Sequence, residues 1–314
     1  MKRTCDIRHM RYYIAVAEEL NFRRAAERLH VAQPALSRAI RQLEADLGTT
    51  LLERTNRRVE MTDAGVVFLE GCRHIASNIE ALVEQTVRAR DGEIGHIYIG
   101  YTDFAISGAL PGIMQDFRAS YPEVSVDLAH MVTATQLEAL RRSEIQVGFL
   151  TGPINEPGFD QLVVQHERLV VILPEAHPLA RLRSIPLERL AEEPFVTGQA
   201  AHWRHFLSHM TAVCHGAGFT PRIVQEAYNS EGIFGLIAAN MGVTLHAESA
   251  RNHFRKGIAI RPLRDNDYRV STLAIWRSDA PSPALRRFVE TIGAWVATHG
   301  QEGWADALPR ATAG

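Results

Sequence analysis

A group of polar side chains between positions 33 and 41 carries the donors that nucleic-acid bases and phosphates accept. On a helix, Gln33, Ser37, Arg38 and Arg41 would share one face. Glutamine and arginine can form paired hydrogen bonds with adenine and guanine edges, and serine and arginine can also contact phosphates. This face therefore predicts contact with double-stranded DNA.

Further arginines follow in the stretch LLERTNRRVEMTDAG, residues 51–65. Its two short runs flank a turn at Asn56-Arg57-Arg58, which is the pattern of a β-wing. On such a wing Arg54, Arg57 and Arg58 would lie beside the DNA backbone.

A second group of polar residues lies where strand-like runs give way to helices: Thr102, Thr133 and Thr197. In open α/β sheets, ligands bind outside the carboxyl ends of strands, where helix N-termini present N–H groups to anions. Three hydroxyls and free amides would suit a small carboxylate. Each threonine could instead cap a helix, an alternative that the sequence leaves open.

Three histidines, His202, His205 and His209, are spaced to share one helix face. Such a face could hold Zn²⁺ or Ni²⁺ or respond to pH. No cysteine or carboxylate is arranged to complete a metal site, and a solvated helix face or a cleft rim is the plainer alternative. We predict no metal site, and keep a metal- or pH-sensing regulator as the alternative function.

Catalytic patterns are missing from the sequence. It contains no G-x-S-x-G, no P-loop, no H-E-x-x-H and no glycine-rich dinucleotide fingerprint. We therefore expect no catalytic residues, no cofactor and no enzyme. An enzyme whose α/β body works on the ligand is the rival from another class, and turnover of a bound ligand would reveal it.

The element that must position the first group is a helix-turn-helix over residues 21–47. Its second helix has an apolar stripe at steps of four, three and four, formed by Leu36, Ile40, Leu43 and Leu47. Pro34 suits the first turn, and Gly48 is a stop signal. A plain helical hairpin is the alternative, but a third helix at residues 7–20 and the wing favour a DNA-binding domain.

A long helix is expected from Asp63 to about Arg90, because this segment contains no proline. Its apolar positions recur like a heptad seam: Phe68, Cys72, Ile75, Ile79, Leu82 and Thr86. Such a seam suits pairing with a second copy of the chain. Burial against the chain's own body is the alternative.

The remainder alternates between strand-like and helical runs, which predicts an α/β domain with a parallel sheet. We expect strands at 97–101, 124–128, 145–150, 162–173, 195–197, 223–227, 242–245 and 270–276, and helices at 107–119, 135–142 and 284–297. Residues beyond about 300, rich in Ala, Gly and Pro, are expected to form a flexible tail.

Charge is divided unevenly along the 314 residues, whose net charge is −2. Residues 1–65 hold 12 Arg and Lys against 9 Asp and Glu, and the rest hold 22 against 27. A basic N-terminal module suits an anionic polymer. No apolar signal region or run of about 20 apolar residues is present, so we expect a cytoplasmic protein with no membrane partner.

The three cysteines, Cys5, Cys72 and Cys214, are too far apart to form a disulfide framework. We expect Cys72 and Cys214 to be buried as small hydrophobic residues.

The stretch AERLHVAQPALSRAIRQLE followed by LLERTNRRVEMTDAG resembles the N-terminal domain of LysR-type transcriptional regulators, across about the first 65 residues. HPLA at 177–180 and AANMGVTLHAES, ending at Ser249, resemble landmarks of that family's effector domain. The resemblance implies two α/β lobes of the periplasmic-binding-protein type, joined by crossings near 160–166 and 264–270. Redox sensors of the family use two cysteines in this domain, whereas only Cys214 lies here, which argues against an intramolecular peroxide switch.

The resemblance also assigns site residues. It implies base reading by Gln33, Pro34, Ser37 and Arg38, phosphate contacts by Arg54 and Arg57, and an effector site at Thr102, Thr133 and Thr197. To these we add Arg58 for DNA and Phe104 and Phe149 for the effector. Phe104, where some relatives have a polar residue, and the charge of Asp103 favour a partly apolar ligand over an inorganic anion.

Two positions depart from the family pattern. Arg23 stands where a Ser or Thr usually starts the second helix, so Asn21 is expected to cap it. Ala32 replaces a frequent Ser or Thr before the recognition helix, which removes one phosphate-binding hydroxyl.

The resulting prediction is a LysR-type, DNA-binding transcriptional regulator controlled by a small-molecule effector, most plausibly a carboxylate. It comprises a winged helix-turn-helix domain (1–65), a dimerising linker helix (66–91), an effector-binding domain (92–300) and a tail (301–314), with lobe I at about 92–163 and 268–300 and lobe II at about 164–267. Expected partners are an interrupted inverted repeat near a promoter, a small-molecule effector, further copies in a homodimer or homotetramer, and RNA polymerase.

Overall fold

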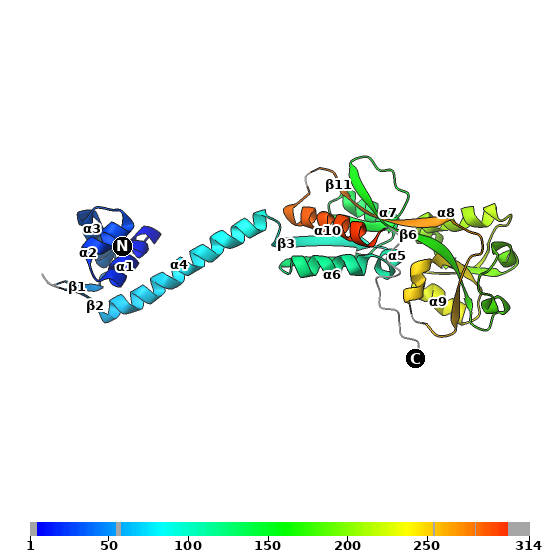
Figure 1. Ribbon diagram of the computed structural model, residues 1–314, viewed down its shortest axis with the longest axis horizontal. Coiled ribbons are helices and arrows are strands. Elements are labelled where there is room, and N and C mark those ends of the chain that lie inside the picture. Colours follow the sequence, from blue (N-terminus) through cyan, green and yellow to red (C-terminus); the bar gives the residue numbers. More distant parts are fainter. Residues whose placement is uncertain (1–4, 55–57, 254, 280, 301–314) are drawn as a thin grey trace. The chain divides into compact units, whose positions relative to one another are not determined.

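The computed structural model describes residues 5–54, 58–253, 255–279 and 281–300. The chain divides into two compact units, Met1–Val87 and Arg88–Gly314. Figure 1 shows the elements of both units. In the part of the chain that the structure describes, no helix combines the length and apolar character needed to cross a membrane.

The first unit is a three-helix cluster followed by a two-stranded wing and a long helix. Its elements are α1 (Ile7–Glu19), α2 (Phe22–Leu29), α3 (Gln33–Leu47), β1 (Leu52–Arg54), β2 (Val59–Met61) and α4 (Asp63–Arg90). Strands β1 and β2 pair antiparallel. The predicted helix-turn-helix, wing and long helix are all present, and the turn at residues 55–57 lies outside the described residues.

Local capping explains where α2 and α3 begin and end. The Asn21 side chain accepts hydrogen bonds from the backbone N–H groups of Arg23 and Arg24, at 2.9 and 3.1 Å. The predicted Asn cap is therefore confirmed. Helix α3 starts after Ala32 without a side-chain cap and ends at Gly48, whose φ of +69° is left-handed.

The seam predicted on α4 divides into two parts. Cys72 is buried, and Phe68 packs edge-on against Tyr13 of α1 at a centroid distance of 5.2 Å. Further along, Ile75, Leu82, Val83 and Val87 are exposed. The start of α4 thus packs on its own unit, which agrees with the alternative that the seam is buried against the chain itself. The later part presents an uncovered apolar surface. Cys214 is also buried, so both cysteine predictions are confirmed.

The second unit contains a lobe I built on a mixed sheet. Its elements are β3 (Gly95–Tyr101), α5 (Asp103–Ser107), α6 (Leu110–Ser120), β4 (Val124–His130), α7 (Thr133–Arg141), β5 (Val147–Thr151), the first part of β6 (Phe159–Pro174), β11 (Arg269–Arg277) and α10 (Pro283–His299). Strand β3 is parallel to β4 and β5, and β11 is antiparallel to β5 and β6. Helices α6 and α10 share one apolar core with β3, while α7 covers the other face.

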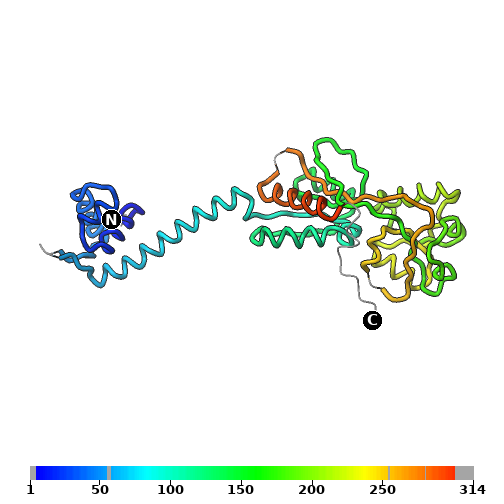
Figure 2. Tube along the Cα trace, in the orientation of Figure 1, coloured from blue at the N-terminus to red at the C-terminus, as the bar shows by residue number. Residues whose placement is uncertain are grey.

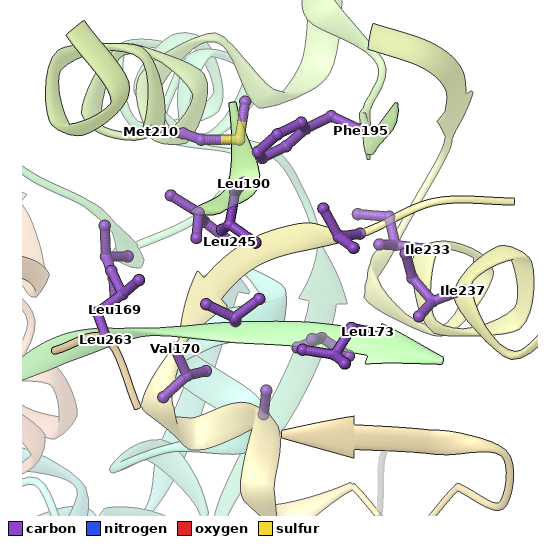
Figure 3. Packing of buried hydrophobic residues seen from close by; sticks show 14 of the residues in the cluster. Leu169, Val170, Leu173, Leu190, Phe195, Met210, Ile233, Ile237, Leu245 and Leu263 are labelled. Atoms are coloured by element: carbon purple, nitrogen blue, oxygen red, sulfur yellow. The ribbon is translucent and has the colours of Figure 1, made fainter. Parts of the chain in front are cut away.

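Lobe II is built on the second part of β6. Its elements are η1 (Pro178–Arg181), η2 (Leu187–Leu190), β7 (Pro194–Gly198), α8 (Ala200–Gly216), β8 (Arg222–Ala227), α9 (Ser230–Ala238), β9 (Thr244–Ala247), η3 (Glu248–Asn252) and β10 (Ile258–Pro262). In its core, Phe195 of β7 faces Met210 of α8 above Leu190 and Leu245 (Figure 3).

The lobes share strand β6. Its first part pairs with β11 and its second part with β9 and β10. The pairing shifts from Gln165 opposite Thr272 to Val163 opposite Leu273, so Val164 is an extra, bulged residue on β6. Figure 2 follows the chain from lobe I through lobe II, green to yellow, and back to lobe I in orange and red. The predicted two-lobed fold is therefore present.

Two details differ from the sequence prediction. The helix expected at 107–119 is α6, which starts at Leu110 with Pro111 in its first turn, and the short helix α5 before it was not predicted. Strand β10 was not predicted. It is a short edge strand whose partners on β6 lie about 85 residues earlier, as in the pair Ile258 and Pro174.

Candidate DNA-reading surface and effector cleft

Helix α3 exposes the predicted base-reading residues because its opposite face is fully buried. Leu36, Ile40 and Leu43 are each 0% exposed in the core of the first unit. Gln33, Pro34 and Arg38 are exposed on α3, and Ser37 is half-buried. The structure therefore brings these four residues onto one accessible surface.

Ser37 already has a partner within α3. The Arg41 guanidinium donates to the Ser37 Oγ at 3.3 Å and to the Ser37 carbonyl at 3.4 Å. Arg41 thus lies over the recognition face, and a contact from Ser37 to DNA would require the guanidinium to move or to share the hydroxyl.

The wing arginine Arg54 is tied to the recognition helix. Its Nη2 lies 2.6 Å from Glu44 Oε2, and its guanidinium lies 4.9 Å from the centre of the Phe22 ring. Glu44 also accepts the backbone N–H groups of Leu51 and Leu52, each at 3.0 Å. Arg54 therefore fixes the wing to α3, and its phosphate contact stays a prediction. Arg58 Nη1 lies 3.9 Å from Glu60 Oε1, and Arg57 lies outside the described residues.

A small cavity lies between the two lobes of the second unit. Lobe I contributes Thr102, Asp103, Phe104, His130, Met131, Val132, Thr133 and Thr151, and lobe II contributes His202, Trp203, His205 and Phe206. The space inside it that a water-sized sphere can occupy is about 30 Å³, within an opening of about 360 Å³ that is continuous with solvent. Ligand pockets usually measure about 300–1,000 Å³. The enclosed part of the cavity is therefore smaller than a usual ligand pocket.

Thr102 and Thr133 lie in this cavity with different hydrogen bonding. The Thr102 Oγ1 has no partner among the described residues, although the side chain is only 8% exposed. The Thr133 Oγ1 accepts the Thr151 N–H at 3.2 Å, which leaves the hydroxyl hydrogen available to a ligand. Neither side chain caps its helix, so the alternative role as caps is not what the geometry shows.

Of the other predicted effector residues, the cavity includes Phe104 but not Phe149 or Thr197. Phe149 is 0% exposed in the core of lobe I, where its ring packs edge-on against Phe288. Thr197 is 1% exposed, and the ring of Trp203 lies against the neighbouring Gly198. Trp203, rather than Thr197, therefore lines the cavity on the lobe II side.

Sequence reasoning missed the polar contact that joins the lobes at the cavity. Asp103 Oδ1 lies 2.9 Å from His130 Nε2, and its Oδ2 accepts the N–H of Ser230 at 2.9 Å and the Ser230 hydroxyl at 3.1 Å. Burial opposes ionisation of Asp103, but the bonds from His130 and Ser230 prevail and lower its pKa. The same bond raises the pKa of His130. Only the charge of Asp103 was visible in the sequence.

The histidines of α8 have separate roles. His202 and His205 line the cavity, and burial lowers the pKa of His205, which favours its neutral form. His209 Nε2 lies 2.6 Å from the Gly152 carbonyl of lobe I, and its Nδ1 lies 2.8 Å from the Tyr268 hydroxyl. Among the described residues, no three His, Cys, Asp or Glu side chains are grouped to hold a metal ion.

Two buried ionisable groups lie near the junction of the lobes. Burial raises the pKa of Glu167, on β6, to about 7, although the Ser249 N–H donates to it at 2.7 Å. Burial lowers the pKa of His246, on β9, to about 4, although its Nδ1 lies 3.2 Å from the Ala247 carbonyl oxygen, a bond that favours the charged ring. At neutral pH His246 is therefore uncharged.

Family models match both units. Residues 7–66 match the bacterial regulatory helix-turn-helix protein, lysR family, and residues 90–297 match the LysR substrate binding domain. The transcriptional regulator AlsR of Bacillus subtilis is 35% identical over 284 residues, which cover 90% of this chain and 94% of AlsR. The Hca operon transcriptional activator HcaR of Escherichia coli is 35% identical over 91% of this chain and 97% of its own.

Solved structures agree with these matches. CbnR, a LysR family transcriptional regulator, has a TM-score of 0.81 at 30% identity, covering 92% of this chain and 100% of CbnR. Full-length CbnR has also been solved in complex with its target DNA, with a TM-score of 0.81 at 29% identity, covering 93% of this chain and 99% of that one. The family and fold class predicted from sequence are thereby confirmed. Both family models match this chain in order, and AlsR shares about a third of its residues with it over nine-tenths of the chain. This chain therefore belongs to the LysR family of transcriptional regulators.

Proposed function

We propose that this regulator reads an interrupted inverted repeat near a promoter through α3 and the wing. The observation that carries this proposal is the exposed face of α3, where Gln33 and Arg38 can reach base edges. Pro34 and Ser37 complete the proposed base-reading surface, and Arg54, Arg57 and Arg58 are the proposed phosphate contacts. The CbnR complex with target DNA supports this assignment.

The inverted repeat requires two copies of the reading surface. The exposed apolar part of α4, with Ile75, Leu82 and Val83, is the proposed contact between copies. We propose a homodimer that can pair into a homotetramer, and RNA polymerase as the partner at the promoter.

The second unit is proposed to bind a small carboxylate between its two lobes. The buried, unpartnered hydroxyl of Thr102 supports this proposal, because a buried polar group without a partner is costly unless a ligand uses it. Lobe separation and closure would then change the population of DNA-bound arrangements. Phe104 and Thr133 are the other proposed contacts from the cavity wall, and Phe149 and Thr197 are kept as proposed residues behind it.

The proposed division of the chain is 1–65 for DNA binding, 66–91 for dimerisation, 92–300 for effector binding and 301–314 as a tail. We place the protein in the cytoplasm, where its DNA partner lies. We propose that it has no enzymatic activity, which mass spectrometry of a bound carboxylate before and after long incubation would test.

The experiment for the main proposal is selection of binding sites from random double-stranded DNA with the purified full-length protein. We expect an interrupted inverted repeat. The variant Leu82→Glu should lose cooperative binding to its two halves, whereas Glu138→Gln, on the exposed face of α7, should retain it. Selection of a single unrepeated site, or unchanged cooperativity in Leu82→Glu, would contradict the proposed dimer.

A further inference from the structure

We propose that Asp103 determines effector specificity by restricting the cleft to ligands with a single anionic group and an apolar body. This inference rests on the proposed carboxylate effector and names its class. Asp103 does so by occupying the Ser230 donors at the start of α9, which a second carboxylate could otherwise use, and by its own negative charge.

The first step concerns the start of α9, in lobe II. A helix N-terminus is the usual place for an anion, because its first N–H groups lack partners within the helix. Here the Ser230 N–H and hydroxyl both donate to Asp103, and the Gly232 N–H donates to Asn229 Oδ1 at 2.9 Å. The chain's own carboxylate therefore takes the place of a ligand's carboxylate.

The second step concerns positive charge. The residues that line the cavity include no Lys or Arg, and His130 is the lining histidine with a raised pKa. His130 is already paired with Asp103 at 2.9 Å. The lining therefore offers no Lys or Arg to a second anionic group, and the Asp103 carboxylate, 17% exposed, would repel one.

The third step concerns the free donors. In lobe I the Thr102 hydroxyl has no partner and the Thr133 hydroxyl hydrogen is available, whereas the unpartnered Thr197 hydroxyl of lobe II lies outside the cavity lining. One carboxylate can be held in lobe I. The facing wall consists of His202, His205, Trp203 and Phe206, and the last two pack against Phe104 at centroid distances of 5.5 and 4.6 Å. The rest of the ligand therefore meets the aromatic rings of this wall.

The test compares matched probes on the full-length protein by calorimetry: benzoate against terephthalate, and hexanoate against adipate. In the natural protein the monocarboxylate of each pair should bind at least about tenfold more tightly. Asp103→Asn keeps the shape but removes the charge, so the ratio should fall several-fold. His130→Gln keeps a donor but removes the balancing cation, so the ratio should rise.

Opposite changes in these two variants distinguish specificity from a general loss of folding, which would weaken both probes together. Asp127→Asn, an exposed carboxylate of lobe I that pairs with His96, is the matched control and should leave the ratio unchanged. The inference would be overturned if the ratio of monocarboxylate to dicarboxylate affinity were equal in the natural protein, Asp103→Asn and His130→Gln. It would also be overturned if the natural protein preferred dicarboxylates. Either result would leave the proposed carboxylate effector intact. Failure of every probe to bind would overturn the carboxylate effector itself, and this inference with it.

Discussion

The proposed DNA-reading surface and the proposed effector cleft are built in different ways. Gln33 and Arg38 lie within six positions of each other on one helix, and burial of the opposite face is enough to expose them. The cleft instead joins residues such as Asp103 and Ser230, which are 127 positions apart. A local surface depends on the stability of a small helical unit, whereas the cleft depends on how two lobes meet. Substitutions in the first region should therefore act through the stability of the helical unit or its DNA contacts, and those in the second through the contacts between the lobes.

The largest effect is expected from Gly65→Ala at the start of α4. A Cβ there would lie 2.2 Å from the Leu51 carbonyl oxygen and 2.6 Å from the Tyr13 hydroxyl. Relief of this overlap must move backbone, so the first unit should lose about 3 kcal/mol of stability. Thermal unfolding should show that unit melting earlier while the second unit is unchanged. Gly71→Ala, on the same helix with nothing within 4 Å, is the control and should be neutral or slightly stabilising. Equal melting of both variants would mean that the two glycines are equivalent.

The next effect concerns pH and the lobe junction. Glu167 has a folded-state pKa of about 7, above its ordinary 4.5, so between these values the folded protein binds the extra proton. Its contribution to stability is full below pH 4.5 and is lost as the pH rises through 7.

Glu167→Gln should therefore gain stability relative to the natural protein as the pH rises from 4.5 to 7, by on the order of 2–3 kcal/mol. Urea unfolding at several pH values would measure this difference. His246 acts in the opposite direction, because its folded-state pKa of about 4 means that the unfolded chain binds more protons up to pH 6.5. A stability difference that does not vary with pH would show that Glu167 is ionised in the folded protein.

On the recognition helix, Gln33→Ala or Arg38→Ala should weaken binding to the selected repeat by roughly 1–3 kcal/mol, with a smaller loss on random DNA. Arg57→Ala should instead weaken binding to all sequences and flatten the salt dependence. Fluorescence anisotropy over a salt series separates these outcomes. Gln161→Ala, in lobe I, is the control. Sequence preference that survived both changes on α3 would place base reading on another element.

The smallest effect is expected from Thr102→Val in the cleft. Benzoate binding should weaken about tenfold, or about 1.4 kcal/mol, while stability changes little because the lost hydroxyl has no partner in the protein. Thr133→Val should also reduce stability, since the buried Thr151 N–H loses its acceptor. Calorimetry and urea unfolding on both variants would show this contrast. Unchanged benzoate affinity in both would exclude the threonines as contacts.

The same contrast explains what could be predicted from the sequence. Apolar periodicity and a stop at Gly48 are local signals, so the boundaries of α3 and the exposure of its polar face follow from nearby residues. Thr102 and Thr133 were also found locally, because each stands at a strand-to-helix junction. His130 and Ser230 carry no such signal, since their role exists only once β4 and α9 lie on either side of Asp103. Strand β10 was missed for the same reason, because its partner on β6 is distant in sequence.

The bulged pairing of β6 with β11 has a mechanical consequence. Two hydrogen-bonded antiparallel strands resist stretching and sliding, but bend and twist more easily where a bulge interrupts their ladder. The interruption falls at Val164 of β6, in lobe I, shortly before β6 begins to pair with β9 of lobe II at Leu169. We therefore expect relative movement of the lobes to occur mainly as bending and twisting at this point of β6. A small ligand held between the lobes would then set the angle between lobe I and lobe II.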